Sequence, residues 1–178
     1  GTRRDTERFY KALEARFELK DPTYLTPDSH ITYVGFDIRM ELRNGVPWYT
    51  MDQHTAMKEF LVEKGVKPSK GISCPMPKAK GLYEDSPLLD EDKAKEYRSS
   101  VGTLNFFAQA TRYDIAHAMS RLGQHMAKPT EASNKALQKV LKYLGANPEL
   151  QLEGTRPKVD TYRFYSDSDH AGDRPATT

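Results

Sequence analysis

The sequence predicts an α+β fold in which a β-hairpin precedes a mainly helical region and one C-terminal strand. Apolar and polar residues alternate without a break over residues 33–42, which is the two-residue period of a strand with one buried face. Asn44-Gly45 follows, and this dipeptide is typical of a two-residue hairpin turn. Over residues 91–145, apolar residues recur every three or four positions, as in helices that bury one face.

The first predicted element is an amphipathic helix over residues 5–20 with three apolar side chains on one face: Phe9, Leu13 and Phe17. Residues 21–30 hold two prolines and two aspartates, which predict a loop before the alternating strand. The return strand of the hairpin is predicted over residues 46–49. Pro47 marks it as an edge strand, because proline cannot donate a hydrogen bond to a neighbouring strand.

Thr50 and Gln53 have the spacing of a capping box, which predicts a helix that runs to about Glu63 and ends before Gly65. Three side chains would form its buried stripe: Met57, Phe60 and Leu61. Residues 66–90 are rich in proline, glycine, serine and lysine, and this composition predicts a linker.

The region 91–155 is predicted to be entirely helical, and its short connections imply antiparallel packing. Thr111 and Asp114 form a capping pattern for a second helix. A Pro-Thr step at 129–130 opens a third helix, which Gly145 would end. The inward side chains of the three helices would be Tyr97, Val101, Leu104, Phe107, Ile115, Met119, Leu122, Met126, Leu137, Val140, Leu141 and Leu144.

Composition limits the classes of function. The 178 residues carry 27 Lys and Arg against 25 Asp and Glu, so the net charge is +2 and any nucleic-acid affinity must come from local patches. A single cysteine, Cys74, excludes an internal disulfide. The five histidines show no metal-ligand spacing, and no apolar run reaches membrane-spanning length, so no membrane partner is expected.

One predicted helix carries a row of basic side chains. Lys135, Lys139 and Lys142 share the face opposite the leucines, and Arg112 lies at the start of the neighbouring helix. Like charges at this spacing slightly destabilise a helix, so the row favours a polyanionic partner such as a phosphate backbone. The alternative is an ordinary solvated face.

The segment 162–173 predicts an aromatic strand that ends in an acid-rich turn containing glycine. Strand alternation places Asp167 and Asp169 on one face, where one carboxylate suits a divalent metal and the other an outer acid. The alternative is a plain exit from a strand into a turn, where serine, aspartate and glycine are common.

Six segments occur in the same order as six motifs of one protein family. They read RFELKD at 16–21, VGFDI at 34–38, YRSSVGTL at 97–104, TRYDIA at 111–116, PTEASNKALQKVLKYL at 129–144 and YSDSDHAGD at 165–173. They resemble RFEMKD, LGIEI, YRSLVGSL, TRPDIA, PTEAHWKALKRVLRYL and YSDADWAGD in the Pol polyproteins of copia-type LTR retrotransposons. Tyr113 stands where proline is usual and His170 where tryptophan is usual. The link after Asp21 is longer than in the family.

The resemblance implies a domain plan. Residues 1–65 would be the end of a palm domain with a primer-grip-like hairpin and the first thumb helix, and 66–90 a linker. Residues 91–155 would be the helical thumb and connection, and 156–178 the first strand of an incomplete RNase H domain. The parent enzyme would perform RNA-templated DNA synthesis and RNase H cleavage with Mg²⁺ or Mn²⁺.

The same resemblance implies roles for individual residues. Asp167 would be a catalytic metal ligand of RNase H, with Asp169 as a second candidate. Gly35 and Phe36 of the hairpin would contact nucleic acid. The family's polymerase carboxylates, including YVDD, lie before the first residue of this chain, and the later RNase H acids lie after its last. We therefore expect the chain alone to be catalytically inactive and to bind no metal tightly.

The expected partner is an RNA/DNA or DNA duplex, bound weakly and without sequence preference, together with the missing fingers, palm and RNase H segments. The resemblance implies location in a cytoplasmic virus-like particle, in the nucleus, or in both. Two alternatives stay open from the sequence. One is a non-catalytic nucleic-acid-binding or protein-interaction module derived from such an element, and the other is a decayed copy.

Overall fold

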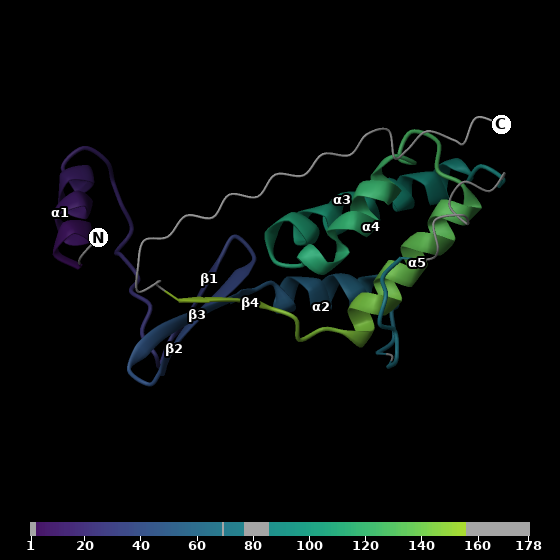
Figure 1. Ribbon diagram of the computed structural model, residues 1–178. Helices are drawn as coiled ribbons and strands as arrows, with labels where there is room; N and C mark the ends of the chain where they lie inside the picture. The colour runs from purple at the N-terminus through teal and green to yellow at the C-terminus, as the bar shows by residue number, and fades with distance from the viewer. Residues whose placement is uncertain (1–2, 69, 77–85, 156–178) are drawn as a thin grey trace, which may run out of the picture.

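The computed structural model describes residues 3–68, 70–76 and 86–155, and it has the predicted α+β fold (Figure 1). The strands form one sheet, and the helices from α2 onward pack beside it. In chain order the elements are α1 (Arg3–Glu14), β1 (His30–Tyr33), β2 (Phe36–Arg43), β3 (Val46–Asp52), α2 (His54–Glu63), α3 (Glu91–Ala110), the 3₁₀ helix η2 (Tyr113–Ile115), α4 (Ala116–Gly123), α5 (Glu131–Ala146) and β4 (Leu152–Thr155).

The sheet has the strand order β1-β2-β3-β4, and every neighbouring pair is antiparallel. β4 was predicted to be helical, and this prediction is wrong: the segment pairs with β3 from Trp48 to Met51. The prediction that Pro47 marks an edge strand is also wrong, because β3 lies between β2 and β4. Proline is tolerated there because the β3–β4 pairing covers only Trp48 to Met51, so no β4 residue needs a backbone donor at position 47. The Pro47 carbonyl accepts a bond from the Thr155 hydroxyl.

Two tight turns shape the sheet. Asn44 and Gly45 have φ values of 53° and 75°, and they form the predicted hairpin turn between β2 and β3. The continuous strand predicted over 33–42 is wrong, because Val34 and Gly35 also have positive φ and turn β1 back onto β2. β-branched residues rarely adopt positive φ. Val34 therefore gave no turn signal in the sequence, and the alternating pattern predicted one continuous strand in place of two.

The hydrophobic core lies among the helices. All the predicted inward side chains of α2, α3, α4 and α5 are buried there, except Met126, which is half-buried at its edge. The periodicity therefore identified the core correctly. Among the described residues, the cluster contains no side chain from the sheet, so the sheet is joined to the helical region by fewer, specific contacts.

The helix boundaries depend on contacts that the sequence motifs did not show. Thr50 lies in β3, so the predicted capping box does not form; the Asp52 carboxylate instead accepts a bond from the His54 backbone N–H over 3.0 Å. Thr130 caps α5 as predicted, in a capping box with Ser133. Gly145 does not end α5, which continues to Ala146.

Gly145 has a packing role instead. A Cβ atom at this position would lie 3.1 Å from Val66 Cγ1, so a larger residue would push the segment after α2 a few tenths of an ångström away from α5. Several residues of the predicted linker pack on the helices: Ile72 and Met76 also contact the helical core, and the Asn147 side chain donates to the Ile72 carbonyl.

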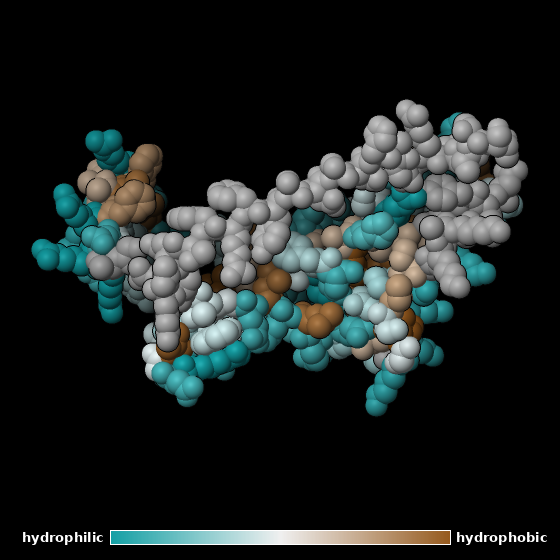
Figure 2. Space-filling model, viewed as in Figure 1, coloured by the Kyte–Doolittle hydropathy of each residue, from teal (hydrophilic) through white to brown (hydrophobic). Residues whose placement is uncertain are grey.

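α1 stands apart from the other elements (Figure 1). The helix begins at Arg3 and ends at Glu14, short of the predicted residue 20, and none of its side chains is buried. Phe9 is 65 % exposed and Phe17, beyond the end of the helix, is 60 % exposed. Figure 2 shows brown, apolar atoms at the surface in the region of α1. The predicted amphipathic pattern is present, but no described element covers its apolar face.

Candidate nucleic-acid interface

A contact between two aromatic rings brings the β1–β2 hairpin against α3. Phe36, the first residue of β2, meets Phe106 edge-on, with ring centroids 6.1 Å apart and ring planes at 64°. Phe106 in turn lies 6.0 Å from Phe107, which is part of the buried core. The turn at Val34 and Gly35 is thereby positioned beside the C-terminal half of α3 by a chain of three rings.

The outer face of α3 is largely polar around a central glycine, with Phe106 four residues beyond that glycine. Four positions on it are three or four residues apart and lie on the surface: Arg98, Gly102, Asn105 and Gln109. A Cβ atom at Gly102 would meet no other atom within 4 Å. Glycine inside a helix costs about 1 kcal/mol relative to alanine, and no packing within the described chain offsets this cost. The helix therefore presents bare backbone to whatever approaches this face.

Sequence reasoning missed this face, although one signal was present. Gly102 falls in the middle of a helix that its flanking periodicity predicts with ease, and an isolated glycine there usually has a packing or functional reason. Phe106, which is 47 % exposed, was not among the predicted inward residues either.

The predicted basic row on α5 does not act as one group. Lys135 and Lys142 are exposed, whereas Lys139 is half-buried and its ammonium donates to the Met76 carbonyl over 3.1 Å. Lys139 therefore ties the segment after α2 to α5. The exposed part of the row is reduced to two lysines seven positions apart.

Arg112 does not belong to the surface. Its side chain is 1 % exposed, and it donates to both carboxylate oxygens of Asp114 over 2.9 and 2.8 Å. A third bond runs from Arg112 Nη1 to the sulfur of Met57 over 3.2 Å. The prediction that Arg112 contacts nucleic acid is therefore corrected. Its guanidinium is buried and already makes these three bonds, so a phosphate cannot reach it.

The Arg112–Asp114 pair has an electrostatic consequence. Burial acts to raise the pKa of Asp114, but the hydrogen bonds and positive charge of Arg112 outweigh burial and hold that pKa below the usual aspartate range. Tyr143 adds a further bond to the carboxylate in the same direction. The pair thus links η2 to α2 and α5, and its role is structural.

The predicted metal ligand Asp167 and the second catalytic candidate Asp169 lie outside the described residues. Within the described part of the chain, no three histidine, cysteine, aspartate or glutamate side chains are grouped so as to hold a metal ion. Nor does any described helix combine the length and apolar character needed to cross a bilayer.

Comparison with known proteins identifies relatives of one main kind. The chain is 34 % identical over 126 residues to the retrovirus-related Pol polyprotein from transposon RE1 of Arabidopsis thaliana, which covers 70 % of this chain and 8 % of that protein. It is 32 % identical over 162 residues to the corresponding polyprotein from transposon RE2 of the same plant, which covers 91 % and 10 %.

A relative of another kind is the secreted RxLR effector protein 161 of Plasmopara viticola, which is 38 % identical over 77 residues, or 43 % of this chain and 54 % of that protein. No family model and no solved structure matches the chain. The chain spans about a tenth of the length of the two Pol polyproteins. The predicted resemblance is confirmed: the chain belongs with the retrovirus-related Pol polyproteins of copia-type transposons, and it corresponds to one segment of them.

Proposed function

We propose that the described part of this chain is the duplex-binding segment of a retrotransposon reverse transcriptase. In this proposal it holds an RNA/DNA hybrid or a DNA duplex and leaves the chemistry to other parts of the polyprotein. The observation that carries the proposal is the Phe36–Phe106 contact, because it joins the hairpin turn at Gly35 to the exposed, glycine-centred face of α3.

The shape of this face suits a hybrid duplex. An A-form helix has a wide, shallow minor groove lined by 2′-hydroxyls and base edges. A helix with bare backbone at Gly102 can approach such a groove closely. The amides of Asn105 and Gln109 can each donate and accept hydrogen bonds there. Contacts of this kind are sequence-tolerant, as a polymerase that copies any template requires.

The β1–β2 turn would contact the sugar-phosphate backbone beside this groove. Gly35 has no side chain to keep a backbone away, and no atom lies within 4 Å of the position its Cβ would take. Lys135 and Lys142 on α5 would add phosphate contacts, whose strength falls with salt. Residues 91–155 keep the proposed role of thumb or connection, with strand β4 at their end, and described residues of the segment 66–90 pack on these helices.

The parent activity is part of the proposal. By resemblance, Asp167 would hold Mg²⁺ or Mn²⁺ in a complete RNase H domain, where two such ions stabilise the attacking and leaving oxygens. Asp169 is a second catalytic candidate. Purified chain should not extend a primer on an RNA template with Mg²⁺. Template-dependent extension by this chain alone would refute the assignment of the chemistry to other segments.

Binding to a labelled RNA/DNA hybrid, followed by fluorescence anisotropy, tests the interface. Gly102→Leu should weaken binding at least tenfold, because the new side chain holds the duplex off the α3 backbone, while helix propensity improves. Gly123→Leu is a matched control, since Gly123 also lies in a helix with open space at its Cβ position. Equal binding by both variants would show that the α3 face does not meet the duplex.

A second candidate is a protein-interaction module, and the match to a protein named as a secreted effector favours it. The two candidates differ in one measurement. A duplex-binding segment loses affinity as salt rises, with a slope that counts phosphate contacts. Absence of any salt-dependent binding to hybrid, DNA duplex or single strand would favour the interaction module.

A further inference from the structure

β2 is longer than the strand that covers its outer edge. β1 pairs only with residues 36–39, so in the described chain residues 40–43 of β2 have a strand neighbour on the β3 side alone. Arg43 and Val46 flank a two-residue turn and therefore face each other as a hydrogen-bonded pair, and this pairing alternates along the ladder. The backbone N–H and C=O groups of Met40 and Leu42 consequently point to the open side.

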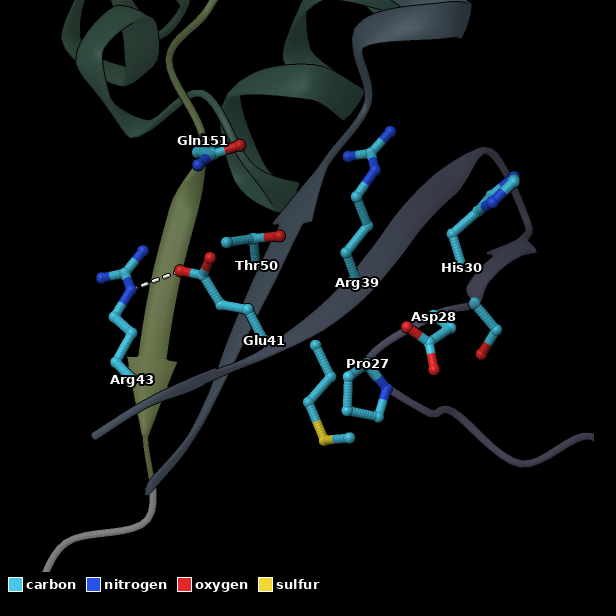
Figure 3. Close-up of a pocket in the computed structure, with 10 residues that line it drawn as sticks. Pro27, Asp28, His30, Arg39, Glu41, Arg43, Thr50 and Gln151 are labelled. Carbon is cyan, nitrogen blue, oxygen red and sulfur yellow. Dashed lines mark hydrogen bonds and ion pairs between the residues drawn. The ribbon is translucent and has the colours of Figure 1, made fainter. Parts of the chain in front are cut away.

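A cavity of about 470 Å³ extends from this edge over one face of the sheet. It is lined by residues of β2, by the segment that enters β1, by Thr50 of β3 and by Gln151. Figure 3 shows Pro27 and Asp28 on one side of this cavity and Glu41 and Arg43 on the other. The chain before β1 does not pair with β2 beyond the His30–Arg39 position, so this edge of β2 has no strand partner in the described chain.

We propose that a second copy of this chain pairs with this edge, strand β2 against strand β2, in an antiparallel dimer with a two-fold axis at Leu42. Such an interface is isologous, so the segment must complement itself. Opposed residues in an antiparallel pair share one face of the sheet. The two-fold axis must therefore pass between a residue and its own copy. The two central positions of the open segment 40–43 are Glu41 and Leu42.

Charge decides between these two registers. An axis at Glu41 sets the two Glu41 carboxylates against each other, and like charges directly opposite are destabilising. An axis at Leu42 sets Leu42 against its own copy and Glu41 against the partner's Arg43, twice. Both registers leave outward-pointing backbone groups paired, Leu42 with its own copy in one and Met40 with Leu42 in the other, so charge makes the difference.

Pairing at this edge would bring together exposed apolar side chains on one face and opposite charges on the other. Leu42 is 57 % exposed, and Tyr49, on the same face of β3, is 42 % exposed. On the opposite face, Arg43 already bonds Glu41 and Glu153, so the partner's Glu41 would join an existing network. Each cross-strand pair contributes about 0.2–1 kcal/mol, and the segment is short. The dimer is therefore weak, depends on concentration and is independent of duplex binding.

Cysteine cross-linking tests the register in the full chain with Cys74→Ser. Two opposed residues of a hydrogen-bonded pair have Cα atoms about 5.5 Å apart, within the range that a disulfide spans. Leu42→Cys should therefore form a covalent dimer under mild oxidation, whereas Glu41→Cys should not, because its copies lie beyond about 7 Å. Val62→Cys is the control, since Val62 is 70 % exposed on α2.

Sedimentation velocity over a hundredfold range of protein concentration gives the second readout. The unchanged chain should show a rising weight-average mass; Leu42→Lys and Arg43→Glu should stay monomeric, and Glu41→Arg combined with Arg43→Glu should associate again. Val62→Lys should behave as the unchanged chain, and circular dichroism checks that each variant is folded. A monomer at all concentrations, preferential cross-linking through Glu41→Cys, or association that survives Leu42→Lys would overturn the proposal.

Discussion

Thr111 at the end of α3 donates a hydrogen bond from its hydroxyl to the side-chain carbonyl of Gln53 at the start of α2, over 2.9 Å. Both side chains are buried, and 58 positions separate them in the sequence. Each belonged to a predicted capping pattern, yet neither accepts a bond from its own helix. They bond to each other and join the end of the sheet to the helical core.

The first prediction concerns this bond. Thr111→Val should lower the free energy of unfolding by about 1–3 kcal/mol, because it leaves the buried carbonyl of Gln53 without a donor. The side-chain nitrogen of Gln53 already has no hydrogen-bond partner among the described residues. Gln53→Met combined with Thr111→Val should cost less than the sum of the single changes, since both polar groups are removed together.

Urea unfolding measures these differences. Thr103→Val is the matched control, because the Thr103 hydroxyl bonds only the Ser99 carbonyl within α3, and the change should stay within about 0.5 kcal/mol. An equal decrease in the free energy of unfolding for Thr103→Val and Thr111→Val would show that the bond to Gln53 does not stabilise the fold more than a local helix bond.

The second prediction concerns pH. The pKa of Asp114 is lowered in the folded chain, so its ion pair with Arg112 contributes stability that is complete above the usual aspartate range, near 3.8, and is lost as pH falls through the lowered pKa. Asp114→Asn should therefore reduce stability at pH 7 and flatten its decline below pH 4. At pH 7, Arg112→Met should cost about 3–5 kcal/mol, because it leaves a partly buried carboxylate unpaired.

Unfolding curves at pH 7 and at pH 3 check both statements. Asp37 contributes acid sensitivity of the same sign, since its bond from Thr32 lowers its pKa, and Asp37→Asn serves as a comparison. An unchanged pH profile in Asp114→Asn would contradict the assigned role of the pair.

The third prediction concerns the β1–β2 turn. Gly35 has a φ of 79°, a region that side chains with a Cβ branch rarely enter, so Gly35→Val should destabilise the hairpin by about 1–3 kcal/mol. Gly35→Asn should cost less, because asparagine tolerates positive φ. Gly154→Val in β4 is the control, since Gly154 does not have positive φ, has open space at its Cβ position, and a strand accepts valine.

Hydrogen exchange of the β1 and β2 amides locates the effect, because only the turn variant should open this hairpin. If both valine variants exchanged alike, the strain would not reside in the turn.

The fourth prediction separates the three lysines of α5. If Lys135 and Lys142 contact phosphates, changing either one to alanine should reduce the log–log salt slope of hybrid binding by about one. Lys139→Ala should leave the slope unchanged and lower stability, because the Lys139 ammonium bonds the Met76 carbonyl. Replacing all three with glutamate should abolish binding. Equal slopes for all single variants would identify the row as a solvated face.

Local patterns identified much of the fold. Helical periodicity placed Tyr97, Leu104 and Leu144 in the core, and each is buried, because a buried helix face requires apolar residues at three- and four-residue intervals whatever the rest of the chain does. Asn44-Gly45 was found because both residues must accept positive φ. The exposed position of Gly102 was available from the same pattern and was overlooked.

The sequence by itself therefore determined the family, the α+β class and the helical core, since these depend on motifs and on neighbours along the chain. Tertiary structure alone decided three other matters. β4 exists because residues 152–155 pair with a strand about 100 positions earlier. Val34 enters a turn because β1 and β2 pair around it, and Arg112 is buried because Asp114 and Met57 bond it. Each depends on contacts that local sequence periodicity does not encode, because the interacting groups meet only after the chain has folded.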